Sequence, residues 1–264
     1  MNRIESKFAE LKSSNETALV TFTMAGDPTI DSSLEVLKAL PDAGADIIEI
    51  GMPFTDPAAD GLTIQKAGIR ALEAGANMIN TLDMVRAFRK NNDDTPIILM
   101  GYVNPVFVYG YEKFSKDASE AGVDGLIIVD LPPEEDAPLR EYTDKYGLDM
   151  IRLITPTTDE ERLPVVLEGA SGFLYYVSIT GVTGTAKADI NALKPHIEMI
   201  KSKSDLPIAI GFGIKTPEDA LEMSSMADAV VVGSAIVYKV KDVNNDETLN
   251  NVTDFVKSLS NALK

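Results

Sequence analysis

The feature that most constrains the fold of this chain is a series of eight short apolar runs with helix-like segments between them. The runs are rich in Val and Ile and lack regular polar alternation, which is typical of parallel strands that helices cover on the outside. They span residues 18–26, 46–53, 96–102, 125–130, 149–155, 173–178, 207–213 and 229–236. Eight strand-then-helix units match the size and rhythm of a TIM (β/α)8 barrel, and a doubly wound open sheet is the alternative.

The length of the chain allows either one large α/β domain or two smaller ones, because 264 residues with 45% hydrophobic content can bury a substantial core. We expect a single TIM-barrel domain over residues 1–264. Ahead of the first run, Ile4, Phe8 and Leu11 are spaced along one face of an amphipathic segment, which predicts an extra N-terminal helix.

Several local patterns predict where helices begin and end. Ser32 with Glu35, and Thr158 with Glu161, match the capping box of a helix start. The polar stretch 239–251 reads as a loop before a last helix.

Two short segments of similar sequence give weak support for a repeated structural unit. The sequences DAGAD at 42–46 and EAGVD at 120–124 each lead from a helix end directly into an apolar run. Glycine at that place is a common helix terminator, so both stretches fit a helix-to-strand turn.

Composition excludes several classes of function. The formal charge of −17 argues against a nucleic-acid binder, and the absence of cysteine rules out disulfides and thiolate metal sites. A single histidine, His196, cannot build a histidine metal cluster. The longest apolar run, 229–237, is too short to span a bilayer, and the N-terminus lacks a signal-peptide core, so we expect a soluble cytoplasmic protein without a metal.

Glu49 is a carboxylate inside a strand-like run that should otherwise be apolar. Because side chains alternate along a strand, Ile48 and Ile50 point one way and Glu49 the other, into the interior of a barrel. Burial would raise the pKa of Glu49 and make it a candidate general acid/base. The alternative is a core glutamate held by hydrogen bonds or by an arginine, for which Arg152 is the candidate.

A second acid, Asp60, follows in the next loop. Asp60 could take part in catalysis, or it could be the N-cap of the amphipathic segment that begins after Gly61. The sequence alone favours neither role. Asp56, before Pro57, is typical of a turn.

Glycine-rich turns end the last three runs, at 180–184, 211–213 and 233–234. Backbone amides in such turns bind phosphate, and in a TIM barrel the loops after strands seven and eight are the usual place. None of the eight runs contains a lysine, so a barrel-strand Schiff base is disfavoured. A substrate cleaved here would have to supply its own electron sink.

Five stretches together resemble the tryptophan synthase alpha subunit family: IEIGMPFTDPAADG, LMGYVNP, GLIIVDLPPEE, YYVSITGVTG and IGFGIKTPEDA. The match runs in order from about Phe22 to Val237. The resemblance implies a TIM-barrel lyase that cleaves indole-3-glycerol phosphate to indole and glyceraldehyde 3-phosphate by acid/base retro-aldol chemistry, late in tryptophan biosynthesis. It implies no cofactor in this chain, and a beta subunit that carries pyridoxal phosphate in an alpha2beta2 complex.

The resemblance also assigns roles to residues. Glu49 matches the catalytic glutamate, Asp60 the aspartate that stabilises charge at the indole N–H, and Tyr175 a tyrosine beside the glutamate. The positions that match the phosphate site are Gly184, Gly213, Gly233 and Ser234. Those that match the indole pocket are Phe22, Met100, Tyr102, Ile127, Thr183 and Phe212. We expect the loop 178–190 to act as a lid, and the partner-facing rim to include Pro53, Phe54, Asp56, Asn104, Pro105, Pro132 and Glu134.

Two positions depart from the family pattern. Leu62 stands where proline usually follows Asp-Gly, and Gly101 where threonine usually precedes the tyrosine. Neither removes a catalytic group, and both leave loop motion and signalling to the partner open. One alternative function is another phosphate-binding barrel, such as a sugar-phosphate isomerase or the enzyme of the same pathway that forms indole-3-glycerol phosphate. The others are a stand-alone indole-releasing lyase and a regulatory phosphate-binding barrel subunit.

Overall fold

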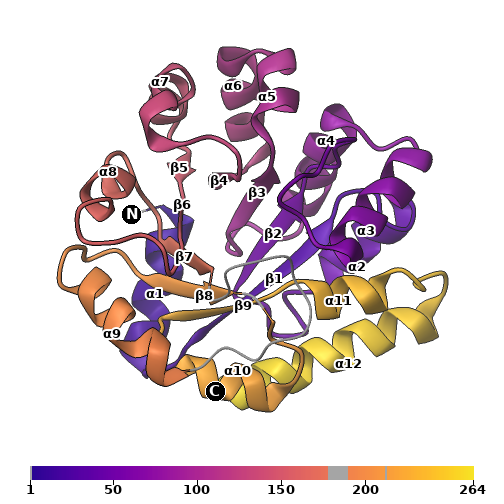
Figure 1. Cartoon of the computed structure of the whole chain (residues 1–264). Coiled ribbons are helices and arrows are strands. Elements are labelled where there is room, and N and C mark those ends of the chain that lie inside the picture. Colours follow the sequence, from indigo (N-terminus) through magenta and orange to yellow (C-terminus); the bar gives the residue numbers. More distant parts are fainter. Residues whose placement is uncertain (1, 178–189, 212) are drawn as a thin grey trace.

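Parallel strands and the helices around them form a barrel in the computed structural model, which describes residues 2–177, 190–211 and 213–264 (Figure 1). The strands are β1 (Ala18–Met24), β2 (Ile47–Gly51), β3 (Ile97–Gly101), β4 (Gly125–Ile128), β5 (Asp149–Met150), β6 (Arg152–Ile154), β7 (Leu174–Val177), β8 (Ile208–Gly211) and β9 (Ala229–Val232). Each ladder between them is parallel, in the order β5-β4-β3-β2-β1-β9-β8-β7-β6.

The ring closes through the fifth apolar run, which the structure divides into β5 and β6 at Ile151. The first half of this run pairs with β4 and the second half with β7, so one segment joins the two ends of the sheet. The predicted TIM (β/α)8 barrel is therefore confirmed, and the open-sheet alternative is wrong.

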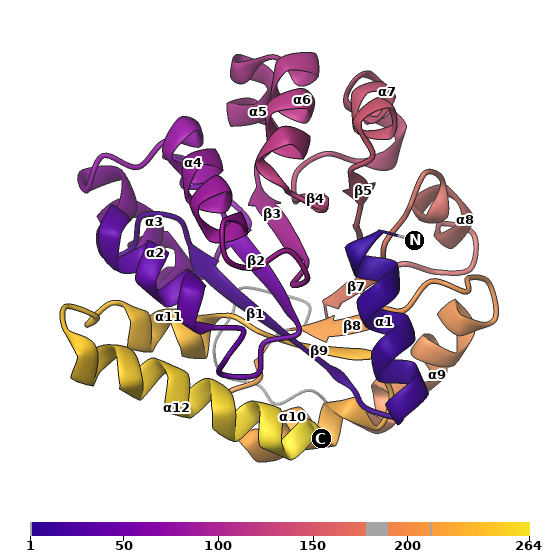
Figure 2. The ribbon, with the colours of Figure 1, turned by 180° about the vertical axis from the view of Figure 1, so that it is seen from behind.

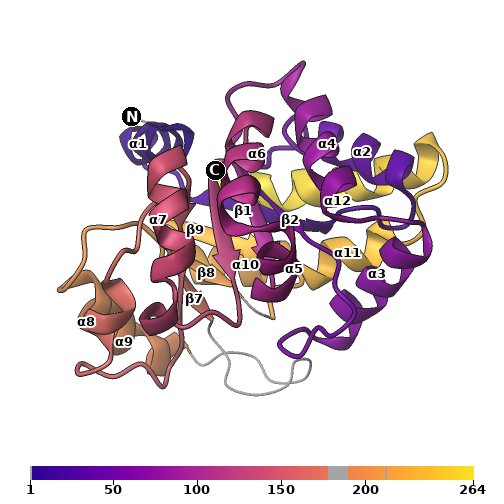
Figure 3. The same cartoon turned by 90° about the horizontal axis from the view of Figure 1, so that it is seen from above.

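Helices surround the barrel, and most of them cover its outer face (Figures 1 and 3). They are α1 (Arg3–Ser14), α2 (Ile30–Ala39), α3 (Leu62–Glu73), α4 (Met78–Arg89), α5 (Val103–Tyr109), α6 (Tyr111–Ala121), the 3-10 helix η1 (Pro133–Glu135), α7 (Ala137–Tyr146), α8 (Leu163–Leu167), α9 (Ile190–Lys201), α10 (Pro217–Ser224), α11 (Ser234–Val240) and α12 (Asp246–Leu263). Among the described residues, none of these helices is long and apolar enough to cross a membrane.

The predicted N-terminal helix α1 closes one end of the barrel (Figure 2). Its buried residues Ile4, Phe8 and Leu11 pack into the same apolar cluster as the inward-facing side chains of the strands. The rings of Phe8 and Phe173 lie 5.8 Å apart, centroid to centroid. Because this end is filled, the opposite end, where the strands finish, is the one left for a site.

Aspartates lie at the starts of three strands, and two of them explain the similarity between segments 42–46 and 120–124. Asp46 accepts a hydrogen bond from the backbone N–H of Leu19 at 2.8 Å, and Asp124 accepts one from Ile97 at 2.7 Å. A third aspartate that the sequence reading missed, Asp228, accepts one from the first residue of β8 at 2.8 Å. Each carboxylate thus binds the start of its neighbouring strand, a stabilising role expected at this end of the barrel.

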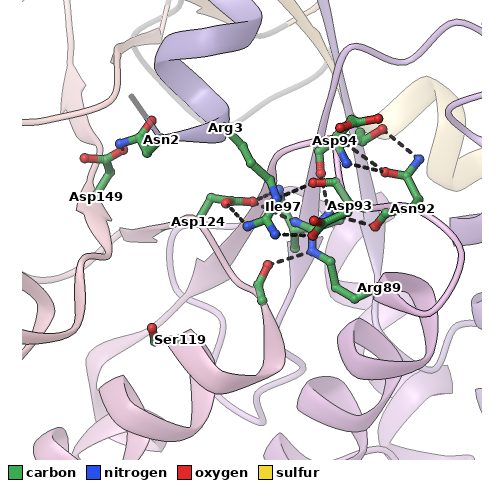
Figure 4. Close-up of polar contacts among 12 residues, drawn as sticks. Asn2, Arg3, Arg89, Asn92, Asp93, Asp94, Ile97, Ser119, Asp124 and Asp149 are labelled. Atoms are coloured by element: carbon green, nitrogen blue, oxygen red, sulfur yellow. Dashed lines mark hydrogen bonds and ion pairs between the residues drawn. The ribbon is translucent and has the colours of Figure 1, made fainter.

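Asp124 also anchors two arginines (Figure 4). Its carboxylate contacts Arg3 Nη1 at 2.9 Å and Arg89 Nη2 at 2.7 Å. Arg3 in turn pairs with the exposed Asp93. Because Arg3 is the first residue of α1, this network joins the N-terminal helix to the strands that it covers.

Two expected helix starts and one expected loop were wrong. The N-cap of α2 is Thr29, which is extended and accepts from the N–H of Ser32, so Ser32 lies inside the helix. Thr158 accepts a hydrogen bond from the N–H of Thr155 within a turn, and α8 begins only at Leu163. The stretch 239–251 is mostly helical, because α11 runs to Val240 and α12 begins at Asp246.

Candidate active site

Glu49 lies in the middle of β2 with its side chain inside the barrel, as the alternation along the strand predicts. It is 1% exposed, while its neighbours Ile48 and Ile50 belong to the apolar cluster between the strands and the helices. Neither carboxyl oxygen has a hydrogen-bond partner within the part of the chain that the structure describes. A buried carboxyl without a partner is costly, which points to a use other than structure.

Arg152 does not hold Glu49, so the alternative of a paired core glutamate is wrong. The Arg152 guanidinium contacts the carboxylate of Asp136, which is fully buried and also pairs with Arg140 at 3.2 Å. Arg152 therefore pairs with Asp136 and not with Glu49.

Burial raises the pKa of Glu49 to about 8. The cause is desolvation, because moving the carboxylate out of water penalises its charged form. Glu49 is consequently protonated at neutral pH and can donate a proton to a substrate, with a pKa close to the range that suits general acid catalysis.

Tyr175 on β7 shares the interior of the barrel with Glu49. Burial and the negative charge of Glu49 raise the pKa of Tyr175 well above its ordinary value. The space for its hydroxyl depends on Gly211, since a Cβ on Gly211 would overlap that oxygen. Tyr175 thus lies inside the barrel, where the charge of Glu49 influences it, and its role in the site stays a prediction.

Asp60 lies at the rim, in the loop between β2 and α3. It is not the N-cap of α3, because Gly61 occupies that position and makes no side-chain capping bond. Burial raises the pKa of Asp60 to about 6, and a hydrogen bond from Tyr102 opposes this rise. Asp60 is therefore largely ionised at neutral pH, whereas Glu49 holds its proton.

The residues expected to enclose an indole ring lie on β1, β3 and β4. Phe22 pairs in register with Glu49 across β1 and β2, and Met100 pairs with Ile127 across β3 and β4. Tyr102 follows β3 directly and is buried. Thr183, Phe212 and the expected lid at 178–190, apart from the start of α9, lie outside the described residues.

The described part of the expected phosphate site lies at the ends of two paired strands, β8 and β9. Gly213 has a φ of +81°, a conformation that favours glycine. Gly233 is the N-cap of α11, and Ser234 is the first residue of that helix. A Cβ on Gly233 would lie 3.5 Å from the Phe22 side chain, so this turn borders the apolar pocket. Gly184 lies outside the described residues.

The two departures from the family pattern differ in their surroundings. A Cβ on Gly101 would collide with the side chain of Met52, so Met52 occupies the space that a larger residue would need. Leu62 begins α3 and is largely exposed. No contact in the structure explains the choice of leucine there.

The expected partner-facing residues follow three neighbouring strands, β2, β3 and β4, and so form one arc of the rim. Asp56, Asn104 and Pro132 are exposed in this arc. Glu134 is also exposed and pairs with Arg162, 3.0 Å from its Nη2. These residues are Pro53, Phe54, Asp56, Asn104, Pro105, Pro132 and Glu134.

Two exposed apolar residues on α5 were missed in the sequence reading. Phe107 is 65% exposed and Val108 is 77% exposed, on the helix that also carries Asn104 and Pro105. The signal was present in the sequence VNPVFVY, because a helix that is apolar on every side cannot bury all its residues against one core.

The burial of Glu49 predicts an unusual dependence of stability on pH. The folded chain keeps the Glu49 proton up to about pH 8, whereas the unfolded chain releases it near 4.5, so stability is lost as the pH rises between these values. Glu49→Gln cannot ionise. It should match the parent near pH 4 and exceed its free energy of unfolding at pH 8 by about 4 kcal/mol.

Urea unfolding at both pH values measures this difference. Glu120→Gln, at an exposed position on α6, is the matched control and should follow the parent at every pH. Equal pH dependence of the Glu49→Gln variant and the parent would show that Glu49 is ionised in the folded chain.

Comparison with known proteins shows the family of this chain. The sequence model of the family described as tryptophan synthase alpha chain matches residues 8–264. The chain is 39% identical to tryptophan synthase subunit alpha from Legionella pneumophila str. Paris, with a TM-score of 0.91 and coverage of 100% of this chain and 98% of that chain.

A tryptophan synthase structure from Mycobacterium tuberculosis is also similar, with 33% identity, a TM-score of 0.91 and coverage of 99% and 98%. An Aquifex aeolicus VF5 structure is 39% identical, with a TM-score of 0.92 and full coverage of both chains. The chain therefore belongs to the tryptophan synthase alpha chain family, a family of lyases in tryptophan biosynthesis.

Proposed function

We propose that this chain cleaves indole-3-glycerol phosphate to indole and glyceraldehyde 3-phosphate. The observation that carries the proposal is the contrast between two carboxyl groups in a member of this family. Glu49 is buried, without a partner among the described residues and protonated at neutral pH, and Asp60 at the rim is largely ionised. Pairs of acids with separated pKa values are typical of acid/base sites.

In the proposed reaction, Glu49 donates its proton to C3 of the indole ring, and the Asp60 carboxylate stabilises the positive charge that develops at the indole N–H. The Glu49 carboxylate then takes the proton of the side-chain hydroxyl. The bond between the ring and the side chain breaks, its electrons return to the ring, and an aldehyde forms. The protonated indole serves as the electron sink, so the proposal includes no cofactor and no metal in this chain.

Substitution of the two acids tests their roles. Glu49→Gln removes the transferable proton and should lower kcat by about 10²–10⁴-fold. Asp60→Asn should also lower kcat strongly, because the charge that stabilises the transition state is lost. Both variants are isosteric and should keep the fold.

Release of indole from indole-3-glycerol phosphate, with and without a beta chain, gives the measurement. The matched controls are Glu120→Gln on α6 and Asp83→Asn on α4, both exposed and expected to keep the parent rate. A loss of less than about threefold in Glu49→Gln would remove it from the mechanism. A parent that binds the substrate without cleaving it would favour the regulatory barrel instead.

We also propose that the substrate phosphate binds the turns that include Gly184, Gly213, Gly233 and Ser234. Ser234→Asp places a carboxylate at this position while keeping the start of α11, where an acidic residue favours a helix. Repulsion of the phosphate should raise KM at least about tenfold with little change in Tm.

Ser6→Asp adds the same charge in the first turns of α1, at the opposite end of the barrel, and should leave KM unchanged. Steady-state kinetics and thermal melting of the two variants decide the assignment. An unchanged KM in Ser234→Asp would place the phosphate elsewhere.

The rim supports a third proposal, that the chain works with a tryptophan synthase beta subunit carrying pyridoxal phosphate, in an alpha2beta2 complex. Indole is small and apolar and would diffuse away if released to solvent. The predicted arc around Asp56 and Asn104, together with the exposed Phe107 and Val108, offers a mixed polar and apolar surface beside the site.

Adding the cognate beta chain should raise the cleavage rate, and Asp56→Lys should reduce this activation more than the basal rate. Asp83→Lys on α4 is the matched charge reversal outside the rim. Sedimentation and kinetics of the purified pair measure both effects. No association at micromolar concentration and no activation would favour a stand-alone indole-releasing lyase.

A further inference from the structure

Tyr102 contacts the loop of Asp60 at two separate points. Its ring packs against Phe54 near the start of the loop, with centroids 5.4 Å apart and planes at 35°. Its hydroxyl oxygen accepts a hydrogen bond from the backbone N–H of Ala59 at 2.9 Å, near the end of the loop. One side chain from the end of β3 thus spans most of the loop that follows β2.

A hydrogen bond from the same hydroxyl lowers the pKa of the Asp60 carboxyl group, against the rise that burial causes. A phenol has one proton to donate and lone pairs to accept with, so accepting from Ala59 leaves its proton for Asp60. Burial and the negative charges of Asp60 and Asp130 raise the pKa of Tyr102 to about 12, which keeps that proton in place. The hydroxyl therefore holds both the backbone before Asp60 and the Asp60 side chain.

Tyr102 is itself held firmly in place. It is 4% exposed and is the N-cap residue of α5, with an extended backbone. The next residue, Val103, donates its N–H to Asp130 at 2.8 Å, which ties the start of α5 to the end of β4. By contrast, the bonds from Ala58 to Asp56 and from Asp60 to Pro57 are local turns within the loop.

We propose that the Tyr102 hydroxyl is a positioning group that sets Asp60 in its working place, in addition to the expected role of the ring in enclosing the substrate. This inference rests on the proposed function for its effect on rate. Its structural part, the fixing of the Ala59–Asp60 segment, is independent of any reaction.

Tyr102→Phe keeps the ring and removes only the hydroxyl. Because hydrogen bonds to charged groups are among the stronger ones, kcat for indole-3-glycerol phosphate should fall roughly tenfold while KM stays near the parent value. In an Asp60→Asn background the same substitution should have little further effect on kcat, because the group that it positions is already disabled. Tyr109→Phe is the matched control, since the Tyr109 hydroxyl donates to Asp117 at 2.7 Å and should not affect kcat.

Hydrogen exchange of the Ala59 amide provides a readout without substrate. The exchange should be roughly tenfold faster in Tyr102→Phe than in the parent, and unchanged in Tyr109→Phe. Parent-like exchange, or an equal loss of kcat from Tyr102→Phe in the parent and in the Asp60→Asn background, would overturn the positioning role. If the parent chain releases no indole, the proposed function fails, and the exchange rates alone decide whether Tyr102 holds the loop.

Discussion

The closed ring of parallel strands buries one ionisable group, Glu49, and the proposed chemistry follows from that burial. The Glu49 side chain is buried, and the interior side chains Val20, Ile47 and Ile98 on the same strands are apolar. Ionisation of Glu49 in such surroundings is unfavourable, so the group keeps a proton that a carboxyl in water would lose. Burial in the barrel thus keeps the Glu49 carboxyl protonated at neutral pH.

Asp60, the second acid, has a lower pKa than Glu49, and the proposed chemistry depends on this difference. Asp60 lies at the rim, where a loop rather than a strand carries it and a phenol donates a hydrogen bond to it. Its pKa therefore rises less than that of Glu49. Two carboxyls from one stretch of 12 residues end in opposite protonation states because one faces the interior and the other the rim.

Stability and function are divided between the two ends of the barrel. At the start of the strands, Asp46, Asp124 and Asp228 bind neighbouring backbone N–H groups, and α1 fills the opening. At the other end, the loops carry Asp60 and the glycine turns, and α5 adds its exposed apolar residues. This separation allows the rim to hold groups that do not contribute to folding, because the structure is secured at the opposite end.

The order of strands and helices and the inward direction of Glu49 could be predicted from the sequence, because both follow from local periodicity along the chain. The resemblance added the roles of Asp60 and Tyr175. Only the tertiary structure decided that Arg152 pairs with Asp136 and leaves Glu49 alone, and that Gly61 rather than Asp60 caps α3. Likewise, the contacts of Tyr102 with Phe54 and Ala59 join segments more than 40 residues apart. Such pairings depend on how the strands close into a ring, which no local pattern in the sequence encodes.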